Sequence, residues 1–219
     1  MNKRNIITST ILIIALCIVG YLYYDRQNQP DTLFRKGLSL HSKDSKKAIK
    51  YYEKAAKKNH YRAQNNLAIL YIESQNPQNL SKARYWLEKM LQTQNNDVQV
   101  LFHLGNLLSE ELYAEYNPED AFYYYKEAAD LGHPAAQHNV AVNFIEGFGV
   151  EENLNNAIIY YKKASEQGYA GSSFNLGLMY AKGKIVPQNL NEAQTYLNKA
   201  CTQGEQKGCE VLHIIRNNQ

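Results

Sequence analysis

The sequence has little excess charge of either sign, which argues against a nucleic-acid-binding role. Its 24 basic and 21 acidic residues leave a net charge of +3. Without Lys3 and Arg4, which precede the first apolar run, the remainder has 22 basic and 21 acidic residues, a net charge of +1. A nearly neutral body offers no electrostatic attraction for nucleic acid, so we expect no such partner.

Recognisable catalytic motifs are also lacking. The chain contains no Gly-x-Ser-x-Gly, Ser-x-x-Lys, Lys-Thr-Gly or His-Glu-x-x-His sequence. Its six histidines are scattered, and His133 and His138 are five residues apart, on different faces of a helix. We therefore expect no catalytic residues, no metal site and no cofactor.

Long hydrophobic runs are absent except at the start of the chain, where residues 6–24 contain no charge. As a helix these 19 residues span roughly 28 Å, close to the thickness of a bilayer core. Lys3 and Arg4 should keep residues 1–5 in the cytoplasm, so that a single-pass anchor exports the rest of the chain. A cleaved signal peptide is the alternative, although no small-x-small site follows the run, and Tyr21–Tyr24 are typical of an interfacial anchor. Residues 25–31 are expected to be a linker.

A period of about 36 residues organises everything that follows. One alanine column and one aliphatic column repeat at this spacing, which predicts two-helix units that bury their apolar faces against neighbouring units. The columns are Ala48, Ala83, Ala121, Ala157 and Ala193, and Leu67, Leu104, Val140, Leu176 and Leu212.

The second helix of each unit, helix B, is expected to begin at a capping residue four positions before the alanine. These residues are Asp44, Asn79, Asn117, Asn153 and Asn189. Helix B then reads Ala-x-x-Tyr-Tyr-x-Lys-Ala-Ala, whose tyrosines we expect mainly to fill the core. Gly132, Gly168 and Gly204 are placed to end the later copies. In the first helix, helix A, a small residue follows the aliphatic column and permits close helix packing.

The pattern Leu-Gly-x-x-Tyr, Gly-x-Gly-Val and Ala-x-x-Tyr-Tyr-x-Lys-Ala resembles the Sel1-like repeat, a bacterial relative of the tetratricopeptide repeat. The copy at residues 136–168 is the fullest. The resemblance implies an all-α solenoid of about five repeats over residues 32–216, followed by a tail at 217–219. Two predicted turns, 73–79 and 109–117, depart from the family pattern, and the second is acidic.

Two cysteines lie in the exported part, Cys201 near the end of a helix B and Cys209 early in the following helix. An even pair at this spacing in an exported domain predicts a disulfide, as in the cysteine-rich Sel1-like proteins that the spacing resembles. A reactive redox pair is the alternative.

Candidate binding residues lie on helix A, which lines the concave face in related tetratricopeptide solenoids. A polar column immediately precedes the aliphatic one, and asparagine there can bind a peptide backbone because its amide both donates and accepts. The alternative is that these side chains bond a neighbouring helix. The candidates are Asn66, His103, Asn139 and Asn175, with Phe102, Asn143 and Phe174 beside them.

Together these observations predict an inner-membrane-anchored periplasmic adaptor or inhibitor that binds another protein. The resemblance includes immunity proteins that neutralise secreted phospholipase effectors, so an effector lipase is one expected partner. A general envelope scaffold is the alternative. A penicillin-binding or β-lactamase-like enzyme is disfavoured because the activated serine is missing.

Overall fold

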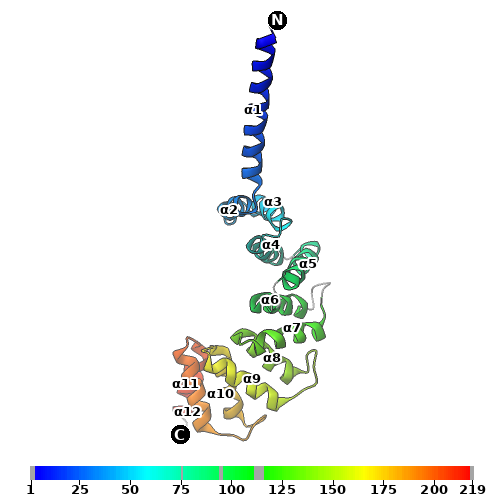
Figure 1. The fold of residues 1–219 in the computed structure, drawn as a ribbon. Coiled ribbons are helices and arrows are strands. Elements are labelled where there is room, and N and C mark those ends of the chain that lie inside the picture. Colours follow the sequence, from blue (N-terminus) through cyan, green and yellow to red (C-terminus); the bar gives the residue numbers. More distant parts are fainter. Residues whose placement is uncertain (1–2, 75, 94–95, 111–115, 218–219) are drawn as a thin grey trace. The chain divides into compact units, whose positions relative to one another are not determined.

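The computed structural model describes residues 3–74, 76–93, 96–110 and 116–217, with side chains from residue 14 onward, and this part of the chain consists of helices joined by turns and loops (Figure 1). It contains twelve helices and no strand. They are α1 Lys3–Asn28, α2 Pro30–Leu40, α3 Ser45–Ala56, α4 Tyr61–Glu73, α5 Pro77–Thr93, α6 Val98–Ser109, α7 Pro118–Asp130, α8 Pro134–Glu146, α9 Leu154–Glu166, α10 Ala170–Lys182, α11 Leu190–Thr202 and α12 Gln206–Asn217. The predicted all-α class is confirmed.

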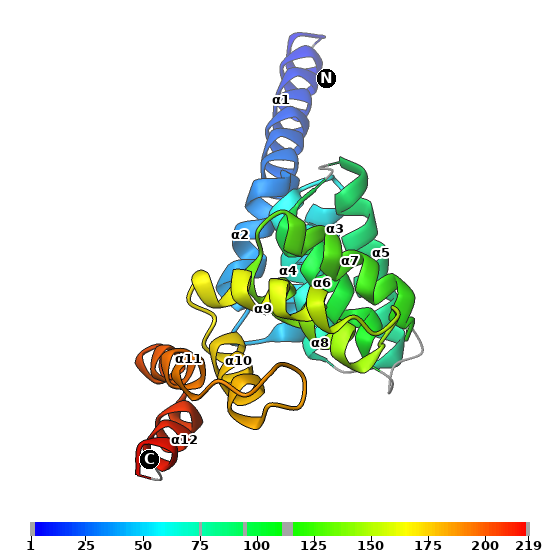
Figure 2. The same ribbon diagram turned by 90° about the horizontal axis from the view of Figure 1, so that it is seen from below.

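The helices form two units, residues 1–90 and 91–219. In unit 1, α1 precedes the hairpin α2–α3, and α3 packs on α4. In unit 2, the hairpins α6–α7, α8–α9 and α10–α11 follow one another, with α7 packed on α8 and α9 on α10. The last helix, α12, packs on α11 and ends the stack (Figure 2). Within unit 2, each hairpin thus contacts the next, which is the solenoid arrangement expected from the repeat.

Both repeating columns lie in the core, as predicted. All five alanines of helix B are fully buried, and the aliphatic residues of helix A are at most 4% exposed. The small residue after the aliphatic column is needed for close packing. A Cβ added at Gly105 would lie 2.5 Å from the Tyr125 ring, and one at Gly177 would lie 2.6 Å from Leu197.

The capping column is confirmed in four of five copies. The side chains of Asp44, Asn117, Asn153 and Asn189 each accept a backbone hydrogen bond from the first turn of helix B. The prediction for Asn79 is wrong, because α5 begins two residues before it, at Pro77. Asn76 caps this helix, accepting a 2.9 Å bond from Gln78 N, and Asn79 instead donates to Ser74 Oγ.

The turn from helix B to the next helix A contains a residue with positive φ in every copy. Gly132, Gly168 and Gly204 have φ of 95°, 90° and 96°, as expected from their position. Asn59 and Asn96 occupy the same place in the first two copies, with φ of 59° and 77°. Asparagine tolerates this left-handed conformation better than most residues, so it substitutes for glycine there.

The predicted disulfide is present: Cys201 on α11 is bonded to Cys209 on α12, with their Cα atoms 4.7 Å apart. In the chain-entropy model, a bond that closes so short a loop stabilises the fold by roughly 2–3 kcal/mol. It fixes the one helix of unit 2 that has no hairpin partner after it in the described chain. Cys17, on α1, is free and exposed.

Helix α1 begins the chain as one continuous helix and extends beyond the predicted membrane span. Among the described residues, no helix combines the length and apolar character required to cross a membrane. The span predicted at 6–24 begins among residues 1–13, whose side chains lie outside the described ones. The predicted linker 25–31 contains the end of α1, Gln29 and the start of α2.

Candidate protein-binding pockets

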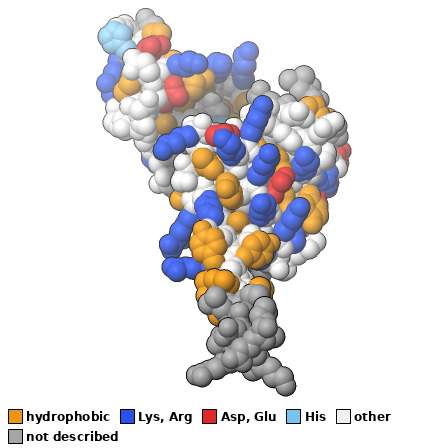
Figure 3. All heavy atoms as spheres, turned by 90° about the horizontal axis from the view of Figure 1, so that it is seen from above, with side chains coloured by type: hydrophobic (Ala, Val, Ile, Leu, Met, Phe, Trp, Pro, Cys, Tyr) orange, Lys and Arg blue, Asp and Glu red, His pale blue; other side chains and the backbone are white. Residues whose placement is uncertain are grey.

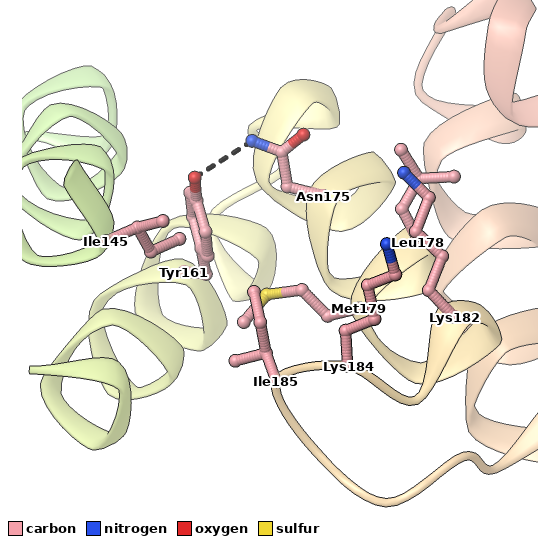
Figure 4. A pocket seen from close by; sticks show the side chains of 8 residues that line it. All are labelled: Ile145, Tyr161, Asn175, Leu178, Met179, Lys182, Lys184 and Ile185. Atoms are coloured by element: carbon pink, nitrogen blue, oxygen red, sulfur yellow. Dashed lines mark hydrogen bonds between the residues drawn. The ribbon is translucent and has the colours of Figure 1, made fainter.

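Two pockets in unit 2 lie on the helix A surface, and α8 contributes to both. The upstream pocket has a volume of about 260 Å³ and the downstream pocket about 350 Å³ (Figure 4). The upstream pocket is lined by Ser109, Tyr125, Asn139, Val142, Asn143, Glu146 and Phe148. The downstream pocket is lined by Ile145, Tyr161, Asn175, Leu178, Met179, Lys182, Lys184 and Ile185. We call these two sites the pocket pair.

The pocket pair is a single repeat feature that occurs twice. Every lining residue of the upstream pocket has its counterpart 36 positions later in the downstream pocket. Tyr125 corresponds to Tyr161, and Asn139 to Asn175, so the tyrosine–asparagine wall is kept. The remaining positions change in character from one pocket to the next. The scaffold therefore presents two equivalent sites whose chemistry differs.

The asparagine of each pocket is held by the tyrosine of the preceding helix B. Asn175 Nδ2 donates to the Tyr161 hydroxyl at 2.9 Å (Figure 4), and Asn66 in unit 1 donates to the Tyr52 hydroxyl at 3.3 Å. Asn139 interacts in the same way with Tyr125. The predicted asparagine column thus bonds a neighbouring helix, while Asn139 and Asn175 still line the pockets.

Burial keeps both tyrosines protonated. It raises the pKa of the Tyr161 hydroxyl to about 12, although the bond from Asn175 acts in the opposite direction. Burial also raises the pKa of Tyr125, although its hydrogen bonds with Ser109 and Asn139 act in the opposite direction. The Tyr125 hydroxyl donates to Asn106 Oδ1 at 2.8 Å. These hydroxyls therefore act as neutral hydrogen-bonding groups at neutral pH.

Asn143 is the one buried polar side chain of the upstream pocket that lacks a partner. It is 6% exposed, and its Nδ2 has no hydrogen-bond acceptor among the residues that the structure describes. An unpaired buried donor costs about 1–3 kcal/mol, so an acceptor supplied from outside would be bound favourably. A peptide carbonyl oxygen is such an acceptor. Its counterpart in the downstream pocket is Met179, which is apolar.

Charge at the rim of the pockets reverses between the two repeats. Glu146 lines the upstream pocket, whereas its counterpart Lys182 lines the downstream pocket together with Lys184. All three side chains are exposed. The downstream pocket also has an apolar wall formed by Ile145, Met179 and Ile185, which Figure 4 shows facing Tyr161.

The other predicted binding residues lie outside the pocket pair. The Phe102 ring stacks on His133, with centroids 4.3 Å apart, at the start of α8. His103 is partly buried, which lowers its pKa, and Phe174 is also partly buried. Of the seven predicted residues, the structure brings Asn139, Asn143 and Asn175 to the pocket pair.

Sequence reasoning missed the residues that distinguish one pocket from the other. Glu146, Lys182 and Lys184 lie at the end of helix A and in the turn that follows, beyond the columns that define the repeat. Their 36-residue correspondence was the signal that would have found them. Among the described residues, no three His, Cys, Asp or Glu side chains group to hold a metal ion. The lining side chains offer apolar surface, charge and hydrogen bonds.

The profile of the Sel1 repeat matches five segments of the chain, residues 33–60, 62–92, 99–133, 134–169 and 170–205. The chain belongs to the Sel1 repeat family. The five Sel1 repeats correspond to the hairpins α2–α3, α4–α5, α6–α7, α8–α9 and α10–α11. The pocket pair spans the last three Sel1 repeats, and α12 lies beyond the final match.

Several solved structures share this Sel1 fold. One is c5321, a protective antigen of uropathogenic Escherichia coli, with a TM-score of 0.73 and 26% identity; the match covers 89% of this chain and 43% of the antigen. This chain therefore spans less than half of that protein's length.

Two further structures are similar in fold alone. A Sel1 repeat protein from Oxalobacter formigenes has a TM-score of 0.71 at 24% identity, with coverage of 96% of this chain and 87% of that one. YrrB, a tetratricopeptide repeat protein with an unusual peptide-binding site, has a TM-score of 0.57 at 19% identity, with coverage of 91% and 97%. No curated protein matches the chain.

Proposed function

We propose that this Sel1 repeat protein is an adaptor or inhibitor that binds an extended segment of a partner protein through the pocket pair. The observation that carries the proposal is the occurrence of one pocket twice, 36 residues apart, on neighbouring A helices. An extended partner segment that runs across α8 and α10 would reach both pockets in turn.

The chemistry of each pocket indicates what such a segment contains. Asn143 would donate to a backbone carbonyl in the upstream pocket, where Glu146 favours a basic side chain. In the downstream pocket, Lys182 and Lys184 favour an acidic group next to an apolar contact. Charge complementarity of this kind sets the direction in which a segment binds.

A catalytic role is not supported by the same pockets. Ser109 Oγ lies 3.1 Å from the Tyr125 hydroxyl and donates to the Asn106 carbonyl at 3.0 Å. The Tyr125 hydroxyl is not a base that would activate this serine, because burial raises its pKa and keeps it protonated. The Asn106 carbonyl is not such a base either. We therefore do not assign the chain a penicillin-binding or β-lactam-hydrolysing activity.

The proposal includes a membrane anchor formed by α1 and a periplasmic location for the repeats. The large apolar side chains of α1 from Ile14 to Tyr24 are 53–68% exposed. The disulfide Cys201–Cys209 supports export, because such bonds persist in oxidising compartments. Basic residues also follow α1, but folded domains are translocated largely irrespective of charge. Protease added to intact spheroplasts should digest the repeats; protection would refute this orientation.

The partner is proposed to be another protein of the envelope. A more specific proposal is that this partner is a secreted effector lipase. In that form the adaptor acts as an immunity protein. Survival of cells challenged with the effector, with and without this chain, separates the immunity role from a general envelope scaffold. Equal survival would leave the scaffold role.

Exchanging the rim charges of the pocket pair should abolish partner binding. We expect the double variant Glu146→Lys, Lys182→Glu to recover at least about tenfold less partner than the wild type, because close charge pairs across an interface are worth 1.5 kcal/mol or more. The measurement is affinity capture of the full, anchored chain from its native envelope, with co-purifying proteins quantified by mass spectrometry.

The matched control exchanges two exposed charges outside the pocket pair, Glu166→Lys and Lys207→Glu. This variant should recover the partner as the wild type does. Equal recovery by both double variants would show that the pockets do not bind the partner.

A further inference from the structure

The near-neutral total charge of the chain is the sum of two opposite charges. Residues 1–90, which form unit 1, contain 16 basic and 6 acidic residues, a net charge of +10. Residues 91–219, which form unit 2, contain 8 basic and 15 acidic residues, a net charge of −7. The whole-chain total therefore conceals a strong excess of basic residues in unit 1.

Half of this net positive charge lies on and beside α3, where residues 43–58 contain seven lysines and two acidic residues. Seven lysines between residues 43 and 58 are exposed, and the acidic residues in this stretch, Asp44 and Glu53, have partners within unit 1. The exposed lysines are Lys43, Lys46, Lys47, Lys50, Lys54, Lys57 and Lys58. Figure 3, seen from the N-terminal side, shows many basic and few acidic side chains on the face toward the viewer.

The lysines of α3 form a stripe along the helix. Lys46, Lys50 and Lys54 are four residues apart, so their side chains lie on one face, which we call the lysine face. The opposite face, with Ala48, is buried against neighbouring helices. Among the described residues, no carboxylate pairs with the three lysines of this face. Like charges at this spacing destabilise a helix, so an external anionic surface would stabilise it.

This basic surface follows directly on the apolar helix α1. Lys36 on α2 donates to Gln27 Oε1 on α1, and α2 packs against α3 in one hairpin. The described part of α1 exposes a run of apolar side chains that ends with three tyrosines, Tyr21, Tyr23 and Tyr24. Tyrosine is enriched where a helix meets the lipid headgroups. The lysine face would therefore begin close to the headgroup region.

We propose that the lysine face of α3 docks on the anionic surface of the membrane in which α1 is anchored. Basic segments next to a membrane helix are attracted to anionic headgroups, and the attraction falls off within a Debye length. The proposal rests on the anchor assigned under the proposed function. It is independent of the pocket pair, which lies in unit 2. Its consequence is that unit 1 is held at the bilayer surface.

Site-by-site lysine acetylation tests this docking. The full chain is reconstituted into nanodiscs of phosphatidylcholine alone, or of phosphatidylcholine mixed with phosphatidylglycerol, and each lysine is followed by mass spectrometry. Lys46, Lys50 and Lys54 should react about fivefold more slowly in the anionic discs, and about 1 M salt should restore their rates. Lys199 and Lys207 in unit 2 are internal controls whose rates should not change.

Equal rates in the two kinds of disc would overturn the docking, and so would uniform slowing of all lysines. Slowing by a DNA duplex but not by phosphatidylglycerol would assign the lysine face to a nucleic acid and also overturn it. If the chain does not enter phosphatidylcholine discs, the anchor is refuted, and flotation with anionic vesicles decides the docking. The double variant Lys50→Glu, Lys54→Glu must then float with these vesicles less than the double variant Lys199→Glu, Lys207→Glu. Equal flotation of the two variants would refute the docking.

Discussion

Alanine at position 149 should unfold the turn between α8 and α9 and loosen the hairpins on either side of it. Gly149 has a φ of 69°, and a Cβ there would lie 2.0 Å from the carbonyl oxygen of Pro118, at the start of α7. The contact is with backbone, which cannot move aside as a flexible side chain can. The strain of a left-handed alanine and the overlap together should cost about 4 kcal/mol.

The measurement is hydrogen exchange by mass spectrometry on the full chain. We expect backbone amides of α8 and α9 to exchange about 1,000-fold faster in Gly149→Ala, since each 1.4 kcal/mol is a factor of ten. Helices of unit 1 should be unaffected and serve as the internal reference.

Gly132→Ala is the matched control, because it isolates the cost of positive φ. Gly132 has a φ of 95°, but a Cβ added there would meet nothing within 4 Å. We expect a cost of about 1 kcal/mol and an increase in local exchange of about fivefold. Equal effects of the two substitutions would contradict the close packing of this turn on α7.

Acidification should destabilise unit 2 well before its carboxylates are protonated. Burial lowers the pKa of His138 to about 4, and burial also lowers the pKa values of His103 and His133. An unfolded histidine has a pKa near 6.5, so the unfolded state binds more protons as the pH falls below this value. Stability is therefore present above pH 6.5 and is lost progressively as the pH falls toward 4.

His138 alone should contribute about 2 kcal/mol to the loss of stability between pH 7 and pH 5. Its Nδ1 lies 2.9 Å from Ser172 Oγ, and its ring faces Tyr161 and Tyr169. None of these groups supplies a negative charge at neutral pH that would compensate a proton on the imidazole. The measurement is urea unfolding of the full chain at the two pH values, followed by circular dichroism.

The variant His138→Gln keeps a hydrogen-bonding group beside Ser172 but does not titrate. Its free energy of unfolding should fall by about 2 kcal/mol less than that of the wild type over the same pH interval. A variant with the same pH dependence as the wild type would show that His138 is already protonated, or accessible to water, in the folded protein.

The architecture could be predicted from the sequence because each repeat places the same residue types at the same depth. The alanine and aliphatic columns are buried in every copy, and four caps and three turn glycines lie where the spacing put them. Repetition supplies several independent observations of one pattern. The disulfide followed from the same columns, because Cys201 and Cys209 fall at facing positions.

The cap of α5 could not be predicted in this way, because its hairpin lacks the usual turn. Without Gly-x-Gly-Val, the chain enters the helix earlier, with Asn76 as cap and Pro77 in the first turn. The spacing of the repeat columns stays the same when a helix begins earlier, so it does not reveal where the helix starts. The other unusual turn includes residues 111–115, which lie outside the described ones.

The hydrogen bonds of the predicted asparagines could not be foreseen, because the repeat pattern does not show which neighbouring group each side-chain amide contacts. Asn66 and Asn175 donate to tyrosines fourteen residues earlier. Predicting these hydrogen bonds requires knowing which helices pack together. Asn143 was correctly placed on the same surface, but its missing partner is a property of the packed structure. The opposite charges of the two units were hidden in the total until the boundary at residue 90 was known.

Photo-crosslinking from within the pocket pair tests whether both pockets bind the same partner protein. A photoreactive residue is placed in the anchored full chain at Val142 or at its counterpart Leu178, one in each pocket, and at Ile159 on α9 as a control that is 50% exposed. We expect irradiation of native cells to link the same partner protein to positions 142 and 178 and not to position 159. Crosslinks from position 159 alone, equal yields at all three positions, or none from either pocket would contradict this expectation.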